Sequence, residues 1–167
     1  GFFDQEAIIG VYRGIGDDAE LVDVFTTELL DVDNLLPTQS DPCAIPPPGF
    51  CTQVGTYNFS YTIDDWPSDE PYTFVYQRCC RNNTISNIVS PEDTGISFST
   101  EISSASQDVC NSSPFFEGLP PTIICANQNI DEFVTALDND GDQLVYEFCA
   151  PFAGGGDTPN NGCFGII

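Results

Sequence analysis

Apolar and polar residues alternate along several short stretches of the chain. In GTYNFSYTI (55–63) every second residue is aromatic or aliphatic, and the residues between them are polar. The segments PYTFVYQRC (71–79) and GISFSTEIS (95–103) repeat this pattern. A period of two is typical of an antiparallel strand that buries one face. We therefore predict a strand in each of the three segments.

Four further segments have strand character. AIIGVYR and LVDVFTTELL lie near the start, joined by the turn GIGDD, and EFVTALD and QLVYEFC lie near the end. Only TTELLDVDNLLP (26–37) also admits a turn of helix. Because Pro, Gly, Asn and Asp separate these short segments, they predict an all-β, disulfide-stapled antiparallel β-sandwich of the Ig-like type.

The segment FFEGLPPT (115–122) is the best candidate for a domain boundary. Its two adjacent prolines are disfavoured in a central strand, and the sequence after them has the pattern of the first strands of a new unit. We predict a β-sandwich module over 1–118 and the beginning of a second Ig/cadherin-like module over 119–167. The alternative is one single domain, 1–167.

The charge of the chain excludes several classes of function. Its 26 acidic residues face three arginines, with no lysine and no histidine, so the formal net charge is −23. Such a surface repels nucleic acid, whose binding requires basic side chains, and it repels anionic membranes. High salt or divalent cations make the charge tolerable, and both point to a location outside the cytosol. Without histidine, Ser-His-Asp and Cys-His catalysis is impossible, and no spacing singles out a carboxylate pair, so we expect no enzyme.

The eight cysteines predict a disulfide framework in an oxidising compartment. No CxxC pair and no histidine is present to form a zinc site. A Cys43–Cys51 bridge would close a stiff, proline-rich loop, and Cys149–Cys163 is a second expected pair. The predicted disulfide cysteines are Cys43, Cys51, Cys79, Cys80, Cys110, Cys125, Cys149 and Cys163.

The neighbours Cys79 and Cys80 lie at the end of a predicted strand. Successive side chains of a strand point to opposite faces. We therefore expect Cys79 and Cys80 to bridge to two different distant cysteines, with Cys110 and Cys125 as the expected partners, and not to each other.

The segment ALDNDGDQLVY (136–146) holds three aspartates around one glycine. Asp140-Gly141 is a favoured type I′ hairpin turn between EFVTAL and QLVYEF. The flanking Asp138 and Asp142 add repulsion that a cation would relieve, and Ca²⁺ takes six to eight oxygen ligands. Two interpretations stay open: a plain acidic turn, or a calcium site of Asp138, Asp140 and Asp142 completed by Glu147 or a backbone carbonyl.

Three other features carry candidate roles. The arginine pair of YQRCCRNNT (76–84) is expected to form structural clamps, with Arg78 in a partly buried ion pair; ligand binding is the alternative. Trp66 is either part of a solvated hairpin tip or a platform on which a sugar ring stacks. Three Asn-x-Ser/Thr sequons offer glycosylation sites, at Asn58, Asn82 and Asn111.

The segments VYQRCCRNNTISNI, CNSSPFFEGLPPTIIC and ALDNDGDQLVYEFCAP together resemble a repeat region of very large secreted Bacteroidetes surface proteins. These proteins are described as gliding-motility-associated or adhesin-like, and they end in a type IX secretion signal. The resemblance covers about 40–165, and the Cys-Cys-Arg-Asn-Asn core is its most specific part. It implies an extracellular β-rich module of a long surface fibre, without a known ligand or chemistry. Family members usually carry a further cysteine just upstream of this segment, which implies an additional pairing partner.

These observations predict a piece of a longer secreted polypeptide that acts as a structural or adhesive module at the cell surface. The expected partners are neighbouring modules of the same chain or identical subunits, with surface glycans as a further class. One alternative is a self-assembling subunit of an extracellular filament or surface layer. A second alternative is a carbohydrate-binding module or glycoside hydrolase that uses Trp66 and nearby carboxylates. No apolar run approaches the length of about 18 residues that a membrane-spanning helix needs.

Overall fold

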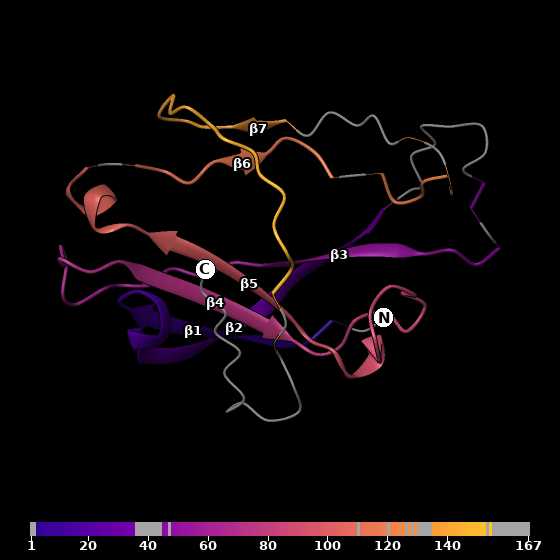
Figure 1. Ribbon diagram of the computed structural model, residues 1–167, viewed down its shortest axis with the longest axis horizontal. Coiled ribbons are helices and arrows are strands. Elements are labelled where there is room, and N and C mark those ends of the chain that lie inside the picture. Colours follow the sequence, from indigo (N-terminus) through magenta and orange to yellow (C-terminus); the bar gives the residue numbers. More distant parts are fainter. Residues whose placement is uncertain are drawn as a thin grey trace.

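Seven β-strands form two antiparallel sheets in the computed structural model (Figure 1). The larger sheet has the order β3-β2-β1-β4-β5, and the smaller one pairs β6 with β7. The strands are β1 (Glu6–Arg13), β2 (Glu20–Leu35), β3 (Thr52–Tyr57), β4 (Tyr72–Arg78), β5 (Ile96–Ile102), β6 (Phe115–Phe116) and β7 (Ala136–Leu137). The structure describes residues 3–35, 45–46, 48–109, 111–119, 121–125, 127, 129, 135–152 and 154. These residues contain short 3₁₀ turns but no α-helix, so the all-β class is confirmed and no described helix can span a bilayer.

The centre of the larger sheet is its best-buried part. β1 pairs with β2 on one side and β4 on the other. Its alternate residues Ala7, Ile9 and Val11 are buried, and Val11 is completely inaccessible. Tyr72 and Val75 of β4 complete the buried apolar set of the described residues. The burial of every second residue places one face of β1 in the core, because successive side chains of a strand point to opposite faces.

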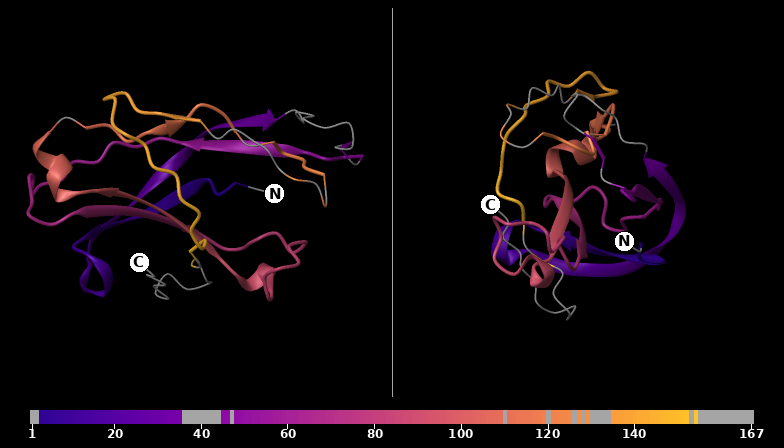
Figure 2. Two further views of the ribbon diagram at one scale, coloured as in Figure 1. Left: turned by 45° about the horizontal axis from the view of Figure 1, so that its top comes forward. Right: turned by 90° about the vertical axis from the view of Figure 1, so that its right-hand side faces the viewer.

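The long strand β2 bends the larger sheet. Its first half pairs with β1 and its second half with β3, and the register shifts between Leu29 and Asp31. A bulge of this kind bends a strand and increases its twist. Figure 2 shows β2 and β3 curving away from β1 and β4 toward the level of β6 and β7. The alternative of a helical turn at 26–37 is wrong over residues 26–35, because pairing with β3 satisfies that backbone as a strand.

Four predicted strands, 7–13, 21–30, 71–79 and 95–103, are confirmed as β1, β2, β4 and β5. The predicted strand 55–63 ends at Tyr57, where pairing with β2 stops. Beyond it, Phe59 and Tyr61 still pack on one side. Their rings lie 5.0 and 5.1 Å from the ring of Phe25, and Tyr61 lies 5.6 Å from Phe74. The aromatic alternation thus identifies a packed face even where no strand forms.

The C-terminal part departs most from the expected pattern. Only Ala136–Leu137 forms a strand within the described part of 132–138, and QLVYEFC (143–149) forms none. β7 pairs with β6 through Phe115–Leu137 and Phe116–Ala136. The second strand of the expected hairpin is therefore replaced by a distant segment. Contacts cross the predicted boundary at 115–122, and the division into 1–118 and 119–167 stays a prediction.

Candidate functional site

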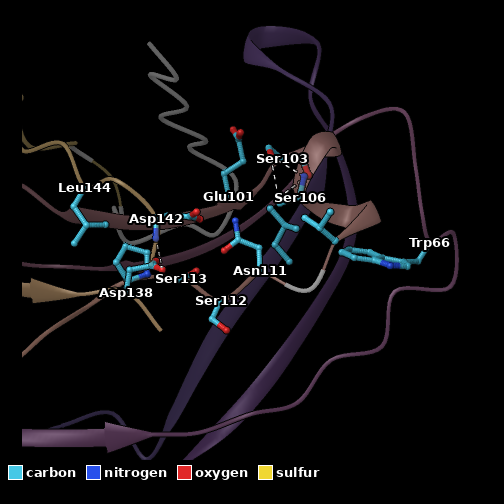
Figure 3. A pocket seen from close by; sticks show the side chains of 13 residues that line it. Trp66, Glu101, Ser103, Ser106, Asn111, Ser112, Ser113, Asp138, Asp142 and Leu144 are labelled. Atoms are coloured by element: carbon cyan, nitrogen blue, oxygen red, sulfur yellow. Dashed lines mark hydrogen bonds between the residues drawn. The ribbon is translucent and has the colours of Figure 1, made fainter. Parts of the chain in front are cut away.

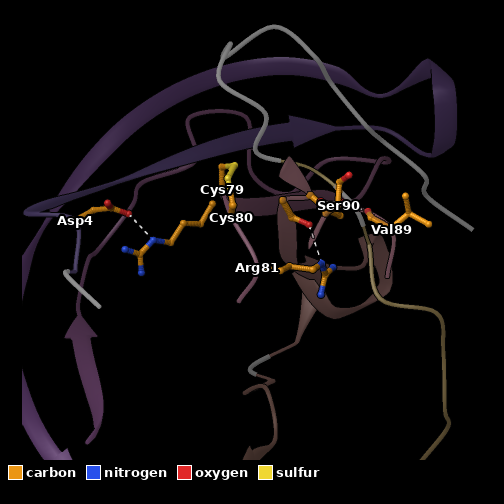
Figure 4. Close-up of a disulfide and its surroundings, with 9 residues drawn as sticks. Asp4, Cys79, Cys80, Arg81, Val89 and Ser90 are labelled. Carbon is orange, nitrogen blue, oxygen red and sulfur yellow. Dashed lines mark hydrogen bonds and ion pairs between the residues drawn. A yellow bond between two sulfur atoms is a disulfide. The ribbon is translucent and has the colours of Figure 1, made fainter. Parts of the chain in front are cut away.

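A disulfide joins the adjacent residues Cys79 and Cys80 (Figure 4), across a cis peptide bond. The prediction that these cysteines bridge to different partners is wrong. It assumed that the alternation of strand side chains continues through both residues. β4 ends at Arg78, so neither cysteine is held in strand geometry. The two side chains are therefore not constrained to opposite faces of the sheet, and their sulfur atoms can bond to each other.

The other described cysteines also differ from the expected scheme. Cys51 and Cys149 carry free, exposed thiols, so the structure does not form the predicted Cys43–Cys51 and Cys149–Cys163 bridges. Cys51 directly precedes β3, and its thiol points to the Asn34 side chain at 3.9 Å. Cys149 lies in a segment that forms no strand and is solvent-exposed.

Cys125 is disulfide-bonded, as expected. The remaining predicted disulfide cysteines lie outside the described residues. They are Cys43, Cys110 and Cys163.

All three arginines hold parts of the fold together. Arg13 contacts three carboxylates, those of Asp65 at 3.2 Å, Glu70 at 3.4 Å and Glu20 at 3.7 Å. It thereby connects the end of β1 to the start of β2 and to the loop before β4. The cation neutralises part of the acidic surface where these three segments meet.

The two arginines beside the disulfide act in the same way. The Arg78 guanidinium pairs with the Asp4 carboxylate at 3.1 Å, so its predicted ion pair is confirmed. Arg81 donates from Nε to the Gly95 carbonyl at 3.1 Å and from Nη2 to the Phe152 carbonyl at 3.0 Å. Figure 4 shows Asp4 on one side of the disulfide and Arg81 on the other. The arginine pair therefore anchors the chain on both sides of Cys79–Cys80.

Hydrogen bonds to the backbone fix the acidic turn. The Asp138 Oδ1 atom accepts from the N–H of Asp140 at 2.9 Å and from the N–H of Asp142 at 3.1 Å. Asp140 Oδ2 accepts from the Ser112 N–H at 2.6 Å. Only Gly141 in this turn has a positive φ, of 81°. A type I′ turn needs a positive φ at both central residues, so that prediction is wrong: Asp138 closes the turn through its side chain instead.

The four predicted calcium ligands do not converge in this arrangement. Within the described part of the chain, no three His, Cys, Asp or Glu side chains form a group that could hold a metal ion. Asp138 and Asp142 both face the same cleft. Asp140 is turned toward Ser112, and Glu147 is exposed outside that cleft. The turn is thus built by backbone hydrogen bonds, and calcium binding stays a prediction.

An open cleft of about 490 Å³ brings together three features that are far apart in the sequence. Trp66 lies at one end, Asp138 and Asp142 lie at the other, and the sequon residue Asn111 lies between them (Figure 3). Ile102 and Val109 add apolar surface to the lining, and Glu101 and several serines add polar groups. The cleft combines an aromatic ring, an amide and carboxylates, as ligand-binding sites commonly do.

The buried residue Gln107 ties two walls of this cleft together. It is 5% exposed and lies in the 3₁₀ turn Ser104–Asp108. Its Oε1 atom accepts from the Ser68 N–H at 2.7 Å, and its Nε2 atom donates to the Glu70 carbonyl at 2.9 Å. The loop that carries Trp66 is also held at Asp65, whose carbonyl accepts a hydrogen bond from the Tyr72 hydroxyl at 3.2 Å. Both ends of the Trp66 loop are therefore fixed.

Sequence reasoning did not identify Gln107, Glu101 or the serines of the cleft. Gln107 lies in the polar stretch SSASQDV, and Glu101 occupies a polar position of β5. Neither position stands out in the sequence, because glutamine and glutamate are also common at ordinary exposed positions.

The three sequons have different surroundings. Asn58 is exposed, and its carbonyl accepts from the Thr27 hydroxyl at 2.8 Å. The Asn82 side chain accepts from both the N–H and the hydroxyl of Thr84, each at 2.9 Å. Asn111 lines the cleft. Each asparagine is at the surface, and glycosylation stays a prediction.

No known protein family, no curated protein and no solved structure matches the chain.

Proposed function

We propose that the chain is an extracellular, non-catalytic structural and adhesive module of a large cell-surface or filamentous protein. One observation carries the proposal: Arg13, Arg78 and Arg81 are all engaged within the fold. The remaining surface charge is therefore of one sign. A net charge of −23 destabilises the folded state through self-repulsion, unless salt or divalent cations screen it. Such conditions fit an extracellular setting better than the cytosol.

The disulfide Cys79–Cys80 supports the same setting, because disulfides persist mainly in oxidising compartments. The resemblance to the repeat region of secreted Bacteroidetes surface proteins rests on the core that contains these two cysteines. We include that kinship in the proposal. The finer architecture belongs to it as well: an Ig-like sandwich over 1–118, followed by the start of a second module over 119–167.

Calcium is the other part of the proposal. Asp138 already fixes the backbone of the acidic turn, and the Asp142 carboxylate lies close to it in sequence and faces the same cleft. An ion that drew these carboxylates together would relieve their repulsion. It would also stabilise the folded state by RT ln(1 + [L]/Kd), about 2.7 kcal/mol at a hundredfold excess over Kd.

Thermal unfolding in three buffers tests both parts. Sodium chloride should raise the melting temperature from its low-salt value, because it screens the surface charge. Calcium chloride at matched ionic strength should raise it further, and chelation should reverse that additional gain. A melting temperature that does not rise with sodium chloride would contradict the charge argument. If sodium chloride reproduces the whole calcium effect, the turn binds no specific ion.

A matched pair of variants locates the calcium effect. Asp140→Asn with Asp142→Asn should abolish the calcium-specific gain. The control is Asp17→Asn with Asp18→Asn, which removes the same charge from the other Gly/Asp turn. The control variant should keep the gain in full. Equal loss in both variants would show that calcium acts on total charge and not on this turn.

Self-assembly into a filament is the second candidate function. It is favoured by an apolar patch on β1 and β2, formed by Ile8, Leu21 and Val24, which are 58%, 49% and 52% exposed. Sedimentation velocity at increasing concentration should reveal association, and Val24→Asp should abolish it. A chain that stays monomeric at every concentration would remove this candidate.

A further inference from the structure

We propose that the Trp66 cleft binds a neutral oligosaccharide. This inference rests on the proposed function, because it assigns a site and a ligand class to the adhesive role. The cleft is formed by the loop that carries Trp66, by described residues of 101–109 and 111–114, and by the acidic turn.

The lining has an apolar end and a polar end. The Trp66 side chain is 43% exposed, and Ile102 and Val109 contribute apolar surface to the same cleft. Asn111 lies in the middle, and Asp142 lies at the far end (Figure 3). A pyranose ring presents a C–H face that can cover an aromatic ring, while its hydroxyls point outward from the ring edge. An oligosaccharide of two or more rings fits such a cleft, because one ring can cover Trp66 while the hydroxyls of the next ring reach the polar end.

The charge of the lining excludes anionic ligands. Glu101, Asp138 and Asp142 face the cleft, and none of the described lining residues is basic. Carboxylates accept hydrogen bonds from sugar hydroxyls, and charge assistance strengthens these bonds. A small organic cation over an aromatic ring is held most strongly where a carboxylate lies close to the same ring. The two aspartates of the cleft lie at the end opposite to Trp66 instead (Figure 3), which favours a longer neutral ligand.

The cleft is preorganised, and its interacting groups are unused. Gln107 fixes the Trp66 loop, and Asp140 fixes the backbone of Ser112 at 2.6 Å. Among the described residues, the side chains of Glu101, Asn111 and Asp142 have no hydrogen-bond or ion-pair partner. Rigid walls lower the entropy lost on binding. These acceptors are then available to sugar hydroxyls, as is the Trp66 indole N–H, which has no partner within the described part of the chain.

The single tryptophan makes the test direct. Titration of the intact chain with neutral gluco-, manno-, xylo- and galacto-oligosaccharides should change the Trp66 fluorescence with saturation for at least one of them. Isothermal titration calorimetry of that ligand should then show at least a tenfold loss of affinity in Trp66→Ala. The matched control is Phe148→Ala, because Phe148 is a fully exposed aromatic residue outside the cleft. The control variant should bind as the parent chain does.

Charge-neutral variants separate a sugar from a cation. Glu101→Gln with Asp142→Asn keeps a hydrogen-bonding oxygen at each position but removes the charge assistance, so affinity for the oligosaccharide should fall by about threefold to tenfold and should not depend on salt. Tetramethylammonium is the competing probe. Binding of tetramethylammonium that falls with salt and with this double variant, and absence of a saturable signal with every oligosaccharide, would each overturn the proposal. Equal loss in Trp66→Ala and Phe148→Ala would also overturn it. The dependence of the melting temperature on sodium chloride does not involve the cleft, so it tests the charge argument of the proposed function separately.

Discussion

Replacing Gln107 should loosen the Trp66 loop more than it disturbs the sheet. Gln107 is 5% exposed and makes two hydrogen bonds, to the Ser68 N–H and to the Glu70 carbonyl. Gln107→Ala removes both. Each such bond contributes about 0.5–1.5 kcal/mol net, so the variant should lose about 1–3 kcal/mol of unfolding free energy. The upper part of this range applies if water cannot reach the two backbone groups.

Two probes distinguish local from global effects. Denaturant unfolding followed by circular dichroism gives the free energy, and the emission of Trp66 reports the loop. In Gln107→Ala the native emission should shift to the red and become easier to quench, because the loop loses both hydrogen bonds to Gln107 and keeps its contacts at Asp65 and the ion pair of Glu70 with Arg13. Gln107→Leu keeps most of the side-chain volume, so it should show the loss of hydrogen bonding without a large cavity.

The matched control is Gln53, an exposed residue that donates one hydrogen bond to Asn34 at 2.9 Å. Gln53→Ala should change the unfolding free energy by at most about 0.5 kcal/mol, and the emission of Trp66 should stay the same. If Gln107→Ala costs no more than Gln53→Ala and leaves the emission unchanged, Gln107 does not tie the two walls of the cleft together.

Two further predictions concern the neighbourhood of the disulfide. Burial, and after it the charge of Asp4, raise the pKa of Tyr76 above its ordinary value of 10.0. The stability that Tyr76 contributes is therefore complete below pH 10.0 and is lost as the pH rises through the raised pKa. Tyr76→Phe removes this ionisation, so it should shift the midpoint of alkaline unfolding upward. An unchanged midpoint would contradict the raised pKa of Tyr76. Non-reducing peptide mapping should find the Cys79–Cys80 ring. Cys79→Ser with Cys80→Ser should lower the free energy of unfolding by only about 1 kcal/mol in denaturant titrations, because the bridge closes the shortest possible loop. A loss of about 3 kcal/mol would show that the disulfide constrains more of the chain than its own turn.

Local patterns were sufficient to predict much of the sheet. The alternation in 71–79 and 95–103 identified two strands correctly, because the period of side-chain direction is a property of the strand itself. The same alternation placed Phe59 and Tyr61 on one face although no strand forms there. Charge and composition likewise follow from the sequence alone.

Predictions failed where a local rule was applied beyond the element that justifies it. The strand rule was extended to Cys79 and Cys80, but β4 ends one residue earlier. The type I′ rule was applied to Asp140-Gly141, but the Asp138 side chain satisfies the turn and β7 pairs with β6 instead. The local pattern shows neither the end of β4 at Arg78 nor the pairing of β7 with β6.

The Trp66 cleft was decided by tertiary structure alone. In the sequence, Trp66, Asn111 and the acidic turn are three separate candidates that no pattern connects. Gln107 joins its wall to Ser68 across 39 residues, and Asp140 joins the acidic turn to Ser112 across 28. Hydrogen bonds over such separations have no period in the sequence, because they depend on how the strands and loops pack together. The residue types were therefore evident from the sequence, whereas their meeting in one cleft depended on the fold.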